Sequence, residues 1–230
     1  MRNLNGTYVH RGDNIRRIRR IRAGLLLLGF VGAVGLVARE RGPAEASAEP
    51  SSMKLSLGGE ARRLQAELNA AKSELDLANA QLQRWHTVFT FSTRFKVPAD
   101  LAGSIYDVAL AEGIEPELAF RLVKLESDFK ERATSPVGAI GLTQLMLPTA
   151  RYFQQGITRE ELYQRDVNLR IGFRYLRTLV REYKGDVRLA LLVYNRGPTA
   201  VTVSREQGID PSNGYDRILM KNYKGSGVVD

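Results

Sequence analysis

The sequence predicts a mainly α fold, in which one helical domain over residues 97–230 is preceded by a membrane-spanning helix and a coiled-coil helix. Three observations carry this prediction. Apolar residues recur at helical spacing through the second half of the chain, and a heptad pattern precedes them. The sequence also lacks pairs of strand-like runs joined by a hairpin turn.

Composition limits the chemistry that the chain can perform. Its 230 residues, 43% of them hydrophobic, suffice for one ordinary domain with appendages. The absence of cysteine excludes disulfides, thiolate nucleophiles and cysteine-bearing zinc sites. The two histidines, His10 and His86, lie far apart, so neither a histidine metal cluster nor a Ser-His-Asp triad is expected. We expect no metal and no cofactor.

The net charge of +9 is concentrated at the N-terminus. Residues 2–22 hold seven arginines and one aspartate, so most of the excess lies in this arm. The small remainder does not call for DNA or RNA as a partner.

Residues 23–38, AGLLLLGFVGAVGLVA, carry no charge and follow the basic arm. We expect an uncleaved, single-pass signal anchor that leaves residues 1–22 in the cytoplasm and sends the rest outward. Two alternatives stay open. One is a signal peptide cleaved after Ala46-Ser47-Ala48, which the charged stretch 39–48 disfavours. The other is a buried core helix, which the adjacent arginines disfavour.

A flexible linker is predicted over residues 39–56 and a coiled coil over residues 57–95. Two interleaved series of apolar residues, each with a period of seven, support the coiled coil. We call these ten the seam residues: Leu57, Leu64, Ala71, Ala78 and Trp85, with Ala61, Leu68, Leu75, Leu82 and Phe89. Because several are small, an amphipathic helix that packs back on the chain's own domain is the alternative.

Helix signals continue through residues 97–230. Pro116 suits a first helical turn, and apolar residues follow it at helical spacing as far as Phe129. Pro148 precedes a short helix over 149–155, and a long amphipathic helix is expected over 166–183 with Gly185 as its C-cap. A nearly continuous apolar helix over 187–195 should be buried.

Glu126 stands beside the apolar stripe in the last turn of the helix that begins near Pro116. Partial burial and the negative end of the helix dipole should both raise the pKa of its carboxyl group. A carboxylic acid that stays protonated near neutral pH can protonate a glycosidic oxygen. A Ser/Gly-rich turn and a second short helix carrying Gln144 are expected to follow.

Four ordered sequence blocks accompany Glu126. They are ESDF at 126–129, GAIGLTQLM at 138–146 followed by PTA at 148–150, Asn168-x-x-x-Gly172-x-x-Tyr175-Leu176, and ALLVYNRG at 190–197. Together, over residues 98–222, these blocks resemble the lytic transglycosylases of the soluble-lytic-transglycosylase (SLT) family, relatives of goose-type lysozyme. The resemblance implies a lysozyme-like domain with Glu126 as its single catalytic acid/base.

The resemblance also assigns binding residues. It implies that Ser127 holds the glutamate or the local backbone, and that Ser135, Gln144 and Met146 line a saccharide cleft. Tyr194 matches a tyrosine whose hydroxyl hydrogen-bonds near the catalytic carboxylate, and Asn195 lies beside it. Met146 could equally be core, Asn168 reads as a helix-start residue, and Tyr175 and Leu176 read as packing residues. Arg196 departs from the family, which usually has alanine there; it could crowd the cleft or meet peptide or carboxylate groups.

The mechanism of the family fits the lack of a credible second carboxylate to act with Glu126. Ordinary glycosidases use two, but Asp128 should point about 100° away from Glu126 around the helix. Asp166, Asp186 and Asp216 stand near expected helix starts, where capping is the expected role. The resemblance implies that Glu126 protonates the leaving oxygen and then deprotonates the substrate's 6-hydroxyl, which closes an anhydro ring.

The sequence therefore predicts a lytic transglycosylase that cleaves peptidoglycan between N-acetylmuramic acid and N-acetylglucosamine. It should sit in the bacterial inner (cytoplasmic) membrane, with its domain in the periplasm or on the outer face, and form a homodimer or bind a partner protein through the coiled coil. One alternative is a hydrolase in which Glu126 activates water. Another is a glycan-binding membrane scaffold, against which the presence of Glu126, Gln144 and Tyr194 argues.

Overall fold

The computed structural model describes residues 50–229, with side chains from residue 57 onward. The predicted basic arm, the predicted anchor over 23–38 and most of the predicted linker lie outside the described residues. Within residues 50–229 no helix combines the length and the apolar character that a membrane span requires.

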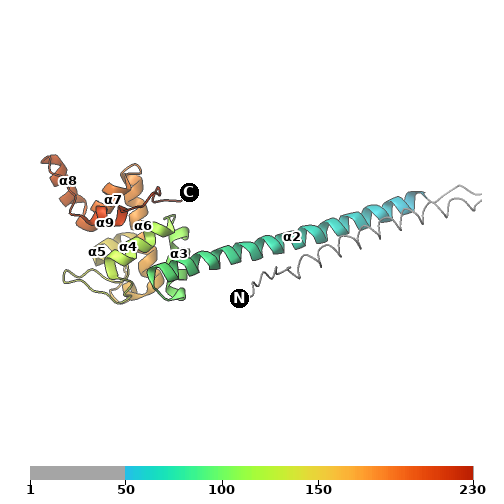
Figure 1. Ribbon diagram of the computed structural model, residues 1–230, viewed down its shortest axis with the longest axis horizontal. Coiled ribbons are helices and arrows are strands. Elements are labelled where there is room, and N and C mark those ends of the chain that lie inside the picture. Colours follow the sequence, from blue (N-terminus) through green and yellow to red (C-terminus); the bar gives the residue numbers. More distant parts are fainter. Residues whose placement is uncertain (1–49, 230) are drawn as a thin grey trace, which may run out of the picture. The chain divides into compact units, whose positions relative to one another are not determined.

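The mainly α prediction is confirmed for the described residues (Figure 1). Regular structure consists of α2 (Pro50–Phe95), α3 (Ala99–Ala111), α4 (Pro116–Ser127), α5 (Leu147–Phe153), the 3₁₀ helix η1 (Glu161–Tyr163), α6 (Arg165–Glu182), α7 (Val187–Arg196), α8 (Pro198–Glu206) and α9 (Tyr215–Met220). Extended pairing in this part of the chain consists of isolated bridges. The long helix α2 begins at Pro50, inside the segment predicted as linker.

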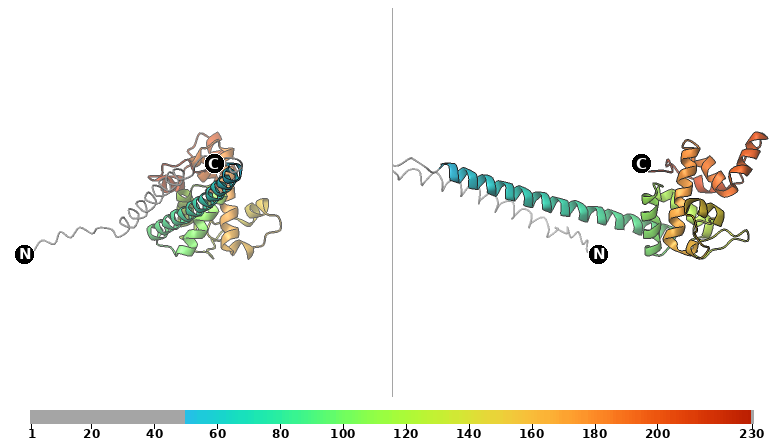
Figure 2. Two further views of the ribbon diagram at one scale, coloured as in Figure 1. Left: turned by 90° about the vertical axis from the view of Figure 1, so that its right-hand side faces the viewer. Right: turned by 180° about the vertical axis from the view of Figure 1, so that it is seen from behind.

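The chain divides into two units, residues 1–72 and 73–230, with the boundary inside α2. In the first unit, residues 57–72 of α2 are exposed, apart from Gly58, which is partly exposed. In the second unit, α6 packs against α3 and α7, α4 packs against α3 and α9, and α8 projects from the rest (Figure 2).

The end of α2 belongs to the core of the second unit. Val88 is 1% exposed, and the Phe91 ring stacks on that of Phe120 from α4 with centroids 4.4 Å apart. Phe95 stacks on the same ring at 5.2 Å. The domain expected to begin at residue 97 therefore includes core residues from the preceding helix.

Most predicted helices lie where the sequence placed them, with corrections at their ends. Asp186 caps α7 as predicted, since its side chain accepts a hydrogen bond from the Leu189 amide at 2.9 Å. The C-cap of α6 is Tyr183 and not Gly185. Lys184 takes the left-handed conformation at φ +55°, and the Gly185 amide donates to the Val180 carbonyl, as in a Schellman motif.

The capping roles expected for two other aspartates are wrong. Gln164 is the N-cap residue of α6 and makes no side-chain cap, while Asp166 lies in the first turn. Asp216 lies inside α9, where it is 1% exposed and pairs with Arg188. Its buried carboxylate forms an ion pair with an arginine that is itself exposed.

Candidate active site

Glu126 lies half-buried in the last turn of α4. The helix starts with Pro116 at its first position and turns the side chains of Leu118 and Leu122 fully into the core. This apolar face draws the end of the helix, and Glu126 with it, against the rest of the domain.

The chain turns sharply after α4 through two left-handed residues. Asp128 has φ +48° and Phe129 has φ +62°, which non-glycine residues seldom adopt. The Phe129 ring packs edge-on against Phe95 at 5.8 Å, and this packing compensates for the strained backbone. The turn sends the chain into the loop that faces Glu126.

The partner of Glu126 is a residue that the sequence analysis missed. Tyr215, the first residue of α9, donates a hydrogen bond from its hydroxyl to Oε1 of Glu126. The tyrosine is 8% exposed. Because 89 residues separate the two, no local pattern marks the contact.

Burial raises the pKa of Glu126 from its usual 4.5 to about 7, against the opposing effect of the Tyr215 hydrogen bond. Among the described residues no lysine, arginine or histidine forms an ion pair with Glu126. The pKa of Tyr215 is raised well above 10 by burial and by the adjacent Glu126. Near neutral pH the tyrosine is therefore a fixed donor, and much of Glu126 is protonated.

The loop facing Glu126 is held by side chains from three helices. Ser127 of α4 donates from its hydroxyl to the Leu142 carbonyl at 2.8 Å. Asn168 of α6 accepts from the Thr143 amide at 2.8 Å, and Tyr194 of α7 donates to the Thr143 carbonyl at 2.9 Å. Residues 142 and 143 are thereby fixed relative to α4, α6 and α7.

Asn168 does more than start a helix, the role expected for it. It is 1% exposed, and its amide group also donates to the Ile140 and Leu162 carbonyls at 2.9 Å. A Cβ on Gly141 would lie 2.3 Å from this amide nitrogen, so the loop approaches Asn168 as closely as a glycine permits.

Gln144 lies in a turn and not on the short helix that was expected. Its φ is +48°, and the flanking bridge between Ile140 and Leu145 forms two backbone hydrogen bonds of 2.9 and 3.0 Å. Its side-chain amide donates to the Gly141 carbonyl at 2.9 Å. The bridge fixes the backbone, so a helical turn cannot form there.

A pocket of about 260 Å³ adjoins this turn, lined by Gln144, Leu145, Met146, Thr149, Tyr175, Tyr194, Asn195, Arg196, Gly197 and Pro198. The structure thus brings together four of the residues predicted to bind saccharide. Met146 is 41% exposed and is not core. Glu126 does not line the pocket. Tyr194 lines the pocket and also lies near Glu126. Burial, and after it the nearby charge of Glu126, raises the pKa of the Tyr194 hydroxyl well above 10.

The two predicted serines do not line this pocket. Ser127 is buried, and both of its hydrogen bonds go to backbone carbonyls, so the structure makes it a support for the loop. Ser135 accepts a hydrogen bond from the Ala139 amide at 3.0 Å and so closes the tip of the loop. A larger cavity of about 580 Å³ lies between α2, α3 and the start of α6, but it contains none of the predicted site residues.

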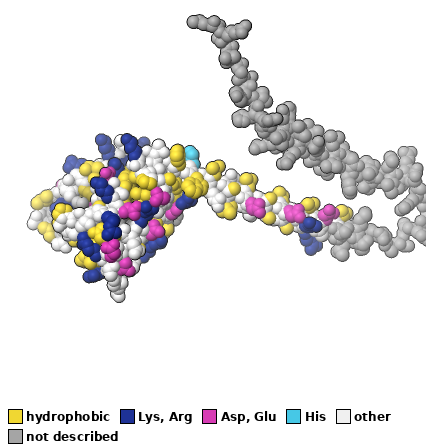
Figure 3. Space-filling view, turned by 90° about the horizontal axis from the view of Figure 1, so that it is seen from below, with side chains coloured by type: hydrophobic (Ala, Val, Ile, Leu, Met, Phe, Trp, Pro, Cys, Tyr) yellow, Lys and Arg dark blue, Asp and Glu magenta, His cyan; other side chains and the backbone are white. Residues whose placement is uncertain are grey.

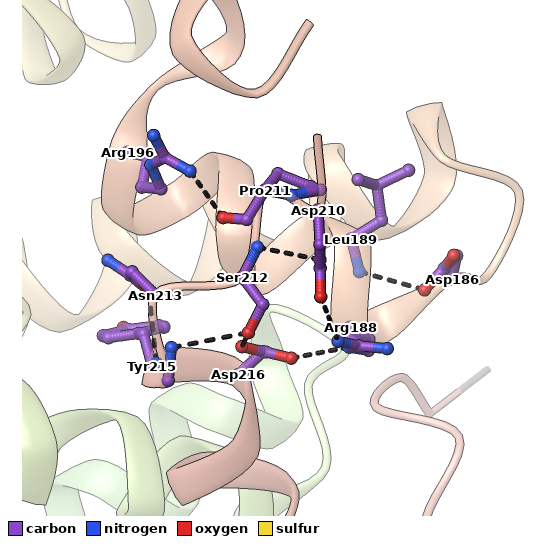
Figure 4. Close-up of polar contacts among 11 residues, drawn as sticks. Asp186, Arg188, Leu189, Arg196, Asp210, Pro211, Ser212, Asn213, Tyr215 and Asp216 are labelled. Atoms are coloured by element: carbon purple, nitrogen blue, oxygen red, sulfur yellow. Dashed lines mark hydrogen bonds and ion pairs between the residues drawn. The ribbon is translucent and has the colours of Figure 1, made fainter. Parts of the chain in front are cut away.

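Arg196 does not project into the pocket as a free cation, although it lines it. Its Nη1 donates to the Pro211 carbonyl at 2.5 Å, and the Asn195 side chain accepts from Asn213 at 2.9 Å. Figure 4 shows Arg196 reaching toward the segment that leads to Tyr215. The end of α7 therefore anchors this segment.

Asp216 secures Tyr215 from the other side. Its carboxylate accepts from Arg188 Nε at 2.5 Å and from the Ser212 hydroxyl at 2.7 Å (Figure 4). Since Asp216 is 1% exposed and follows Tyr215 directly, this ion pair fixes the first turn of α9. Tyr215 is thus held in position for its bond to Glu126.

A second carboxylate at Glu126 is absent from the described residues. Asp128 is exposed and pairs with Lys124 at 3.5 Å, and no other acidic side chain contributes to the raised pKa of Glu126. Residues 57–229 contain no cluster of His, Asp or Glu that could hold a metal ion. The site offers one protonated carboxyl group, two buried tyrosines and an adjoining pocket.

Comparisons with known proteins show which family the helical domain is similar to. Residues 104–212 match the family model described as "Transglycosylase SLT domain". A curated relative, named transglycosylase, from Enterobacteria phage PRD1 is 40% identical over 84 residues, which are 36% of this chain and 30% of the phage protein. The match to the family model covers a little under half of the chain, and the chain spans 30% of the phage protein's length.

Solved structures of lytic transglycosylases are also similar to the chain. An inactive mutant of lytic transglycosylase Slt from Pseudomonas aeruginosa is 28% identical, with a TM-score of 0.43, over 50% of this chain and 21% of that one. The 70-kDa soluble lytic transglycosylase of Escherichia coli is 24% identical, with a TM-score of 0.46, over 56% and 24% of the two chains. The 70-kDa soluble lytic transglycosylase in complex with bulgecin A is 21% identical, with a TM-score of 0.48, over 61% and 27%.

The buried carboxyl group predicts a pH-dependent difference in stability between the wild type and Glu126→Gln. The folded-state pKa of Glu126 is about 7, above the usual 4.5. The contribution of this carboxyl group to the free energy of unfolding of the wild type is therefore fully present below pH 4.5. The wild type loses stability as the pH rises toward 7, where the buried group ionises. Urea unfolding should show the free energy of unfolding of the variant gaining on that of the wild type across this window, by on the order of 3 kcal/mol, and then levelling off. Equal differences at pH 5 and pH 8 would contradict the raised pKa.

Proposed function

We propose that the chain is a lytic transglycosylase that cleaves the bond between N-acetylmuramic acid and N-acetylglucosamine in peptidoglycan. The observation that carries the proposal is the half-buried Glu126 carboxyl group, with a pKa of about 7, within the residues that match the transglycosylase SLT domain. An acid with that pKa is protonated often enough at neutral pH to donate to a leaving oxygen, and its conjugate base is strong enough to accept a proton afterwards.

One acid then serves both halves of the reaction. Glu126 gives its proton to the glycosidic oxygen as the bond from that oxygen to C1 of the muramic acid breaks. The resulting carboxylate takes the proton of the 6-hydroxyl of the same sugar, whose oxygen forms the new bond to C1. The reaction gives two products: one glycan has a free 4-hydroxyl on N-acetylglucosamine, and the other ends in a 1,6-anhydro sugar. Glu126 is again protonated.

The tyrosines suit this cycle because they do not titrate with Glu126. Tyr215 donates to the carboxyl group in either protonation state, and its bond favours the carboxylate that must form midway. The pocket beside Tyr194 supplies an amide and a thioether at Gln144 and Met146, groups suited to the polar edges and apolar faces of a sugar ring.

Hydrolysis by an activated water molecule is the competing reaction. In ordinary glycosidases a second carboxylate either activates a water molecule or acts as the nucleophile itself. The described residues place no second carboxylate at Glu126. This favours the substrate's own hydroxyl as the nucleophile.

Glu126→Gln should abolish cleavage of purified peptidoglycan sacculi, with a loss of several orders of magnitude, because the amide keeps the shape but carries no acidic proton. Mass spectrometry of wild-type products should find 1,6-anhydro ends, one water lighter than hydrolytic ends. Asp128→Asn is the matched control, since this nearby carboxylate is exposed and, among the described residues, pairs with Lys124 alone. It should cleave like the wild type.

Two outcomes would count against this proposal. Reducing ends as the main wild-type product would make the chain a hydrolase. Cleavage by Glu126→Gln at the wild-type rate would remove Glu126 from the mechanism and leave glycan binding by a scaffold as the function.

We also propose that residues 23–38 anchor the chain in the cytoplasmic membrane, with the domain on the outer side where peptidoglycan lies. The arginine-rich arm before an uncharged run supports this orientation. Mass spectrometry of the protein purified from membranes should detect peptides that precede Ala48. A mature N-terminus at Glu49 would contradict the anchor.

A further inference from the structure

The ten seam residues of α2 form an apolar surface that the described part of the chain leaves uncovered. Seven of them are large side chains with 54–68% exposure: Leu57, Leu64, Leu68, Leu75, Leu82, Trp85 and Phe89. The alanines at 61, 71 and 78 are exposed as well. Hydrophobic side chains recur along the surface of α2 in Figure 3. An apolar surface of this extent marks an interaction site.

Within the second unit, the domain packs on a different face of α2 from the one that carries the seam. Val88, Phe91 and Phe95 face the core, and they lie roughly 100° around the helix from Trp85 and Phe89. Arg84 pairs with Asp107 and Arg94 with Glu117 on this side, which fixes the rotation of the helix end. The seam residues between 75 and 89 stay exposed beside this packed face.

The spacing of the seam specifies another helix as its occupant. Seam residues alternate at intervals of four and three, which is the spacing of the two core positions of a heptad. In that register Ala61, Leu68, Leu75, Leu82 and Phe89 occupy the a positions, and Leu57, Leu64, Ala71, Ala78 and Trp85 the d positions. Every core position is apolar from 57 to 89, which suits the same stripe on a second copy.

Charge beside the seam specifies the direction of that second helix. Glu60, Glu67 and Glu74 immediately precede a positions and so flank the seam as g residues, while Lys72 is an e residue. In a parallel pair each g residue faces the e residue of the partner's next heptad, so Glu67 meets the second copy's Lys72. In an antiparallel pair g residues face g residues, and the glutamates would repel one another.

We propose that residues 57–89 of two copies of this chain form a parallel, in-register coiled coil. The second copy is the occupant because the surface is self-complementary in both its apolar spacing and its flanking charge. Ala71 and Ala78 make the middle of the seam narrow, so the two helices approach closely there. This dimer involves α2 alone and is separate from the proposed enzymatic activity.

Sedimentation equilibrium of the purified full chain in mild detergent tests the dimer. The wild type should be dimeric. The double substitution Leu68→Glu and Leu75→Glu should raise the dissociation constant at least about 100-fold, because it buries four like charges in one seam. Leu77→Glu is the matched control, since Leu77 is 61% exposed on the same helix but off the seam, and it should dimerise like the wild type.

A wild type that stays monomeric at high concentration, or equal association of the seam and control variants, would overturn the proposal. If the wild type is monomeric, the partner that covers the seam would be a different protein.

Engineered disulfides test the direction, and the cysteine-free chain gives them no competitor. Ala61→Cys and Ala78→Cys, made separately, should each give a covalent dimer on mild oxidation, because every residue meets its own copy in a parallel, in-register pair. An antiparallel pair can centre on only one of these positions. Cross-linking at one position alone, or at neither, would overturn the parallel arrangement.

Discussion

The site depends on the burial of one carboxyl group without a cationic partner. In the part of the chain that the structure describes, Tyr215 is the side chain that donates a hydrogen bond to Glu126, and burial outweighs that bond in setting the pKa of Glu126 near 7. An ion pair would reverse the result, because a nearby guanidinium favours the carboxylate. Arg188 is instead paired with Asp216, and Arg196, which lines the pocket, donates to the Pro211 carbonyl.

Two rigid segments converge on Glu126 from distant parts of the chain. One is the loop at residues 140–145, which Ser127, Asn168 and Tyr194 hold from three helices. The other is the segment before α9, which Arg196 and the Asp216–Arg188 ion pair secure. Polar side chains thus replace regular sheet or helix in fixing irregular backbone, and the cost of their burial is offset by complete pairing.

The sequence could predict features that depend on local chemistry. Pro116 and the apolar spacing after it marked α4 and the place of Glu126 on it, and Asp186 was recognised as a cap because capping acts within one turn. The predicted dimer along α2 has the same local basis, since a heptad is a property of a single helix.

Features that depend on distant contacts escaped prediction. Tyr215 reaches Glu126 across 89 residues, and nothing around it distinguishes it from the chain's other tyrosines. Gln144 was expected on a helix, but tertiary hydrogen bonds at residues 140–145 override local propensity. Arg196 was expected to affect the cleft or the substrate, whereas its hydrogen bond goes to the backbone of Pro211.

The account rests on a Glu126 carboxyl group that ionises near neutral pH, and a direct titration of that group tests it. In protein labelled with ¹³C at the glutamate carboxyl carbon, the NMR resonance missing from Glu126→Gln identifies the group. The account predicts a midpoint near pH 7 in the wild type and a higher midpoint in Tyr215→Phe, where the bond that favours the carboxylate is lost. A wild-type midpoint near 4.5, the ordinary value for glutamate, would contradict it.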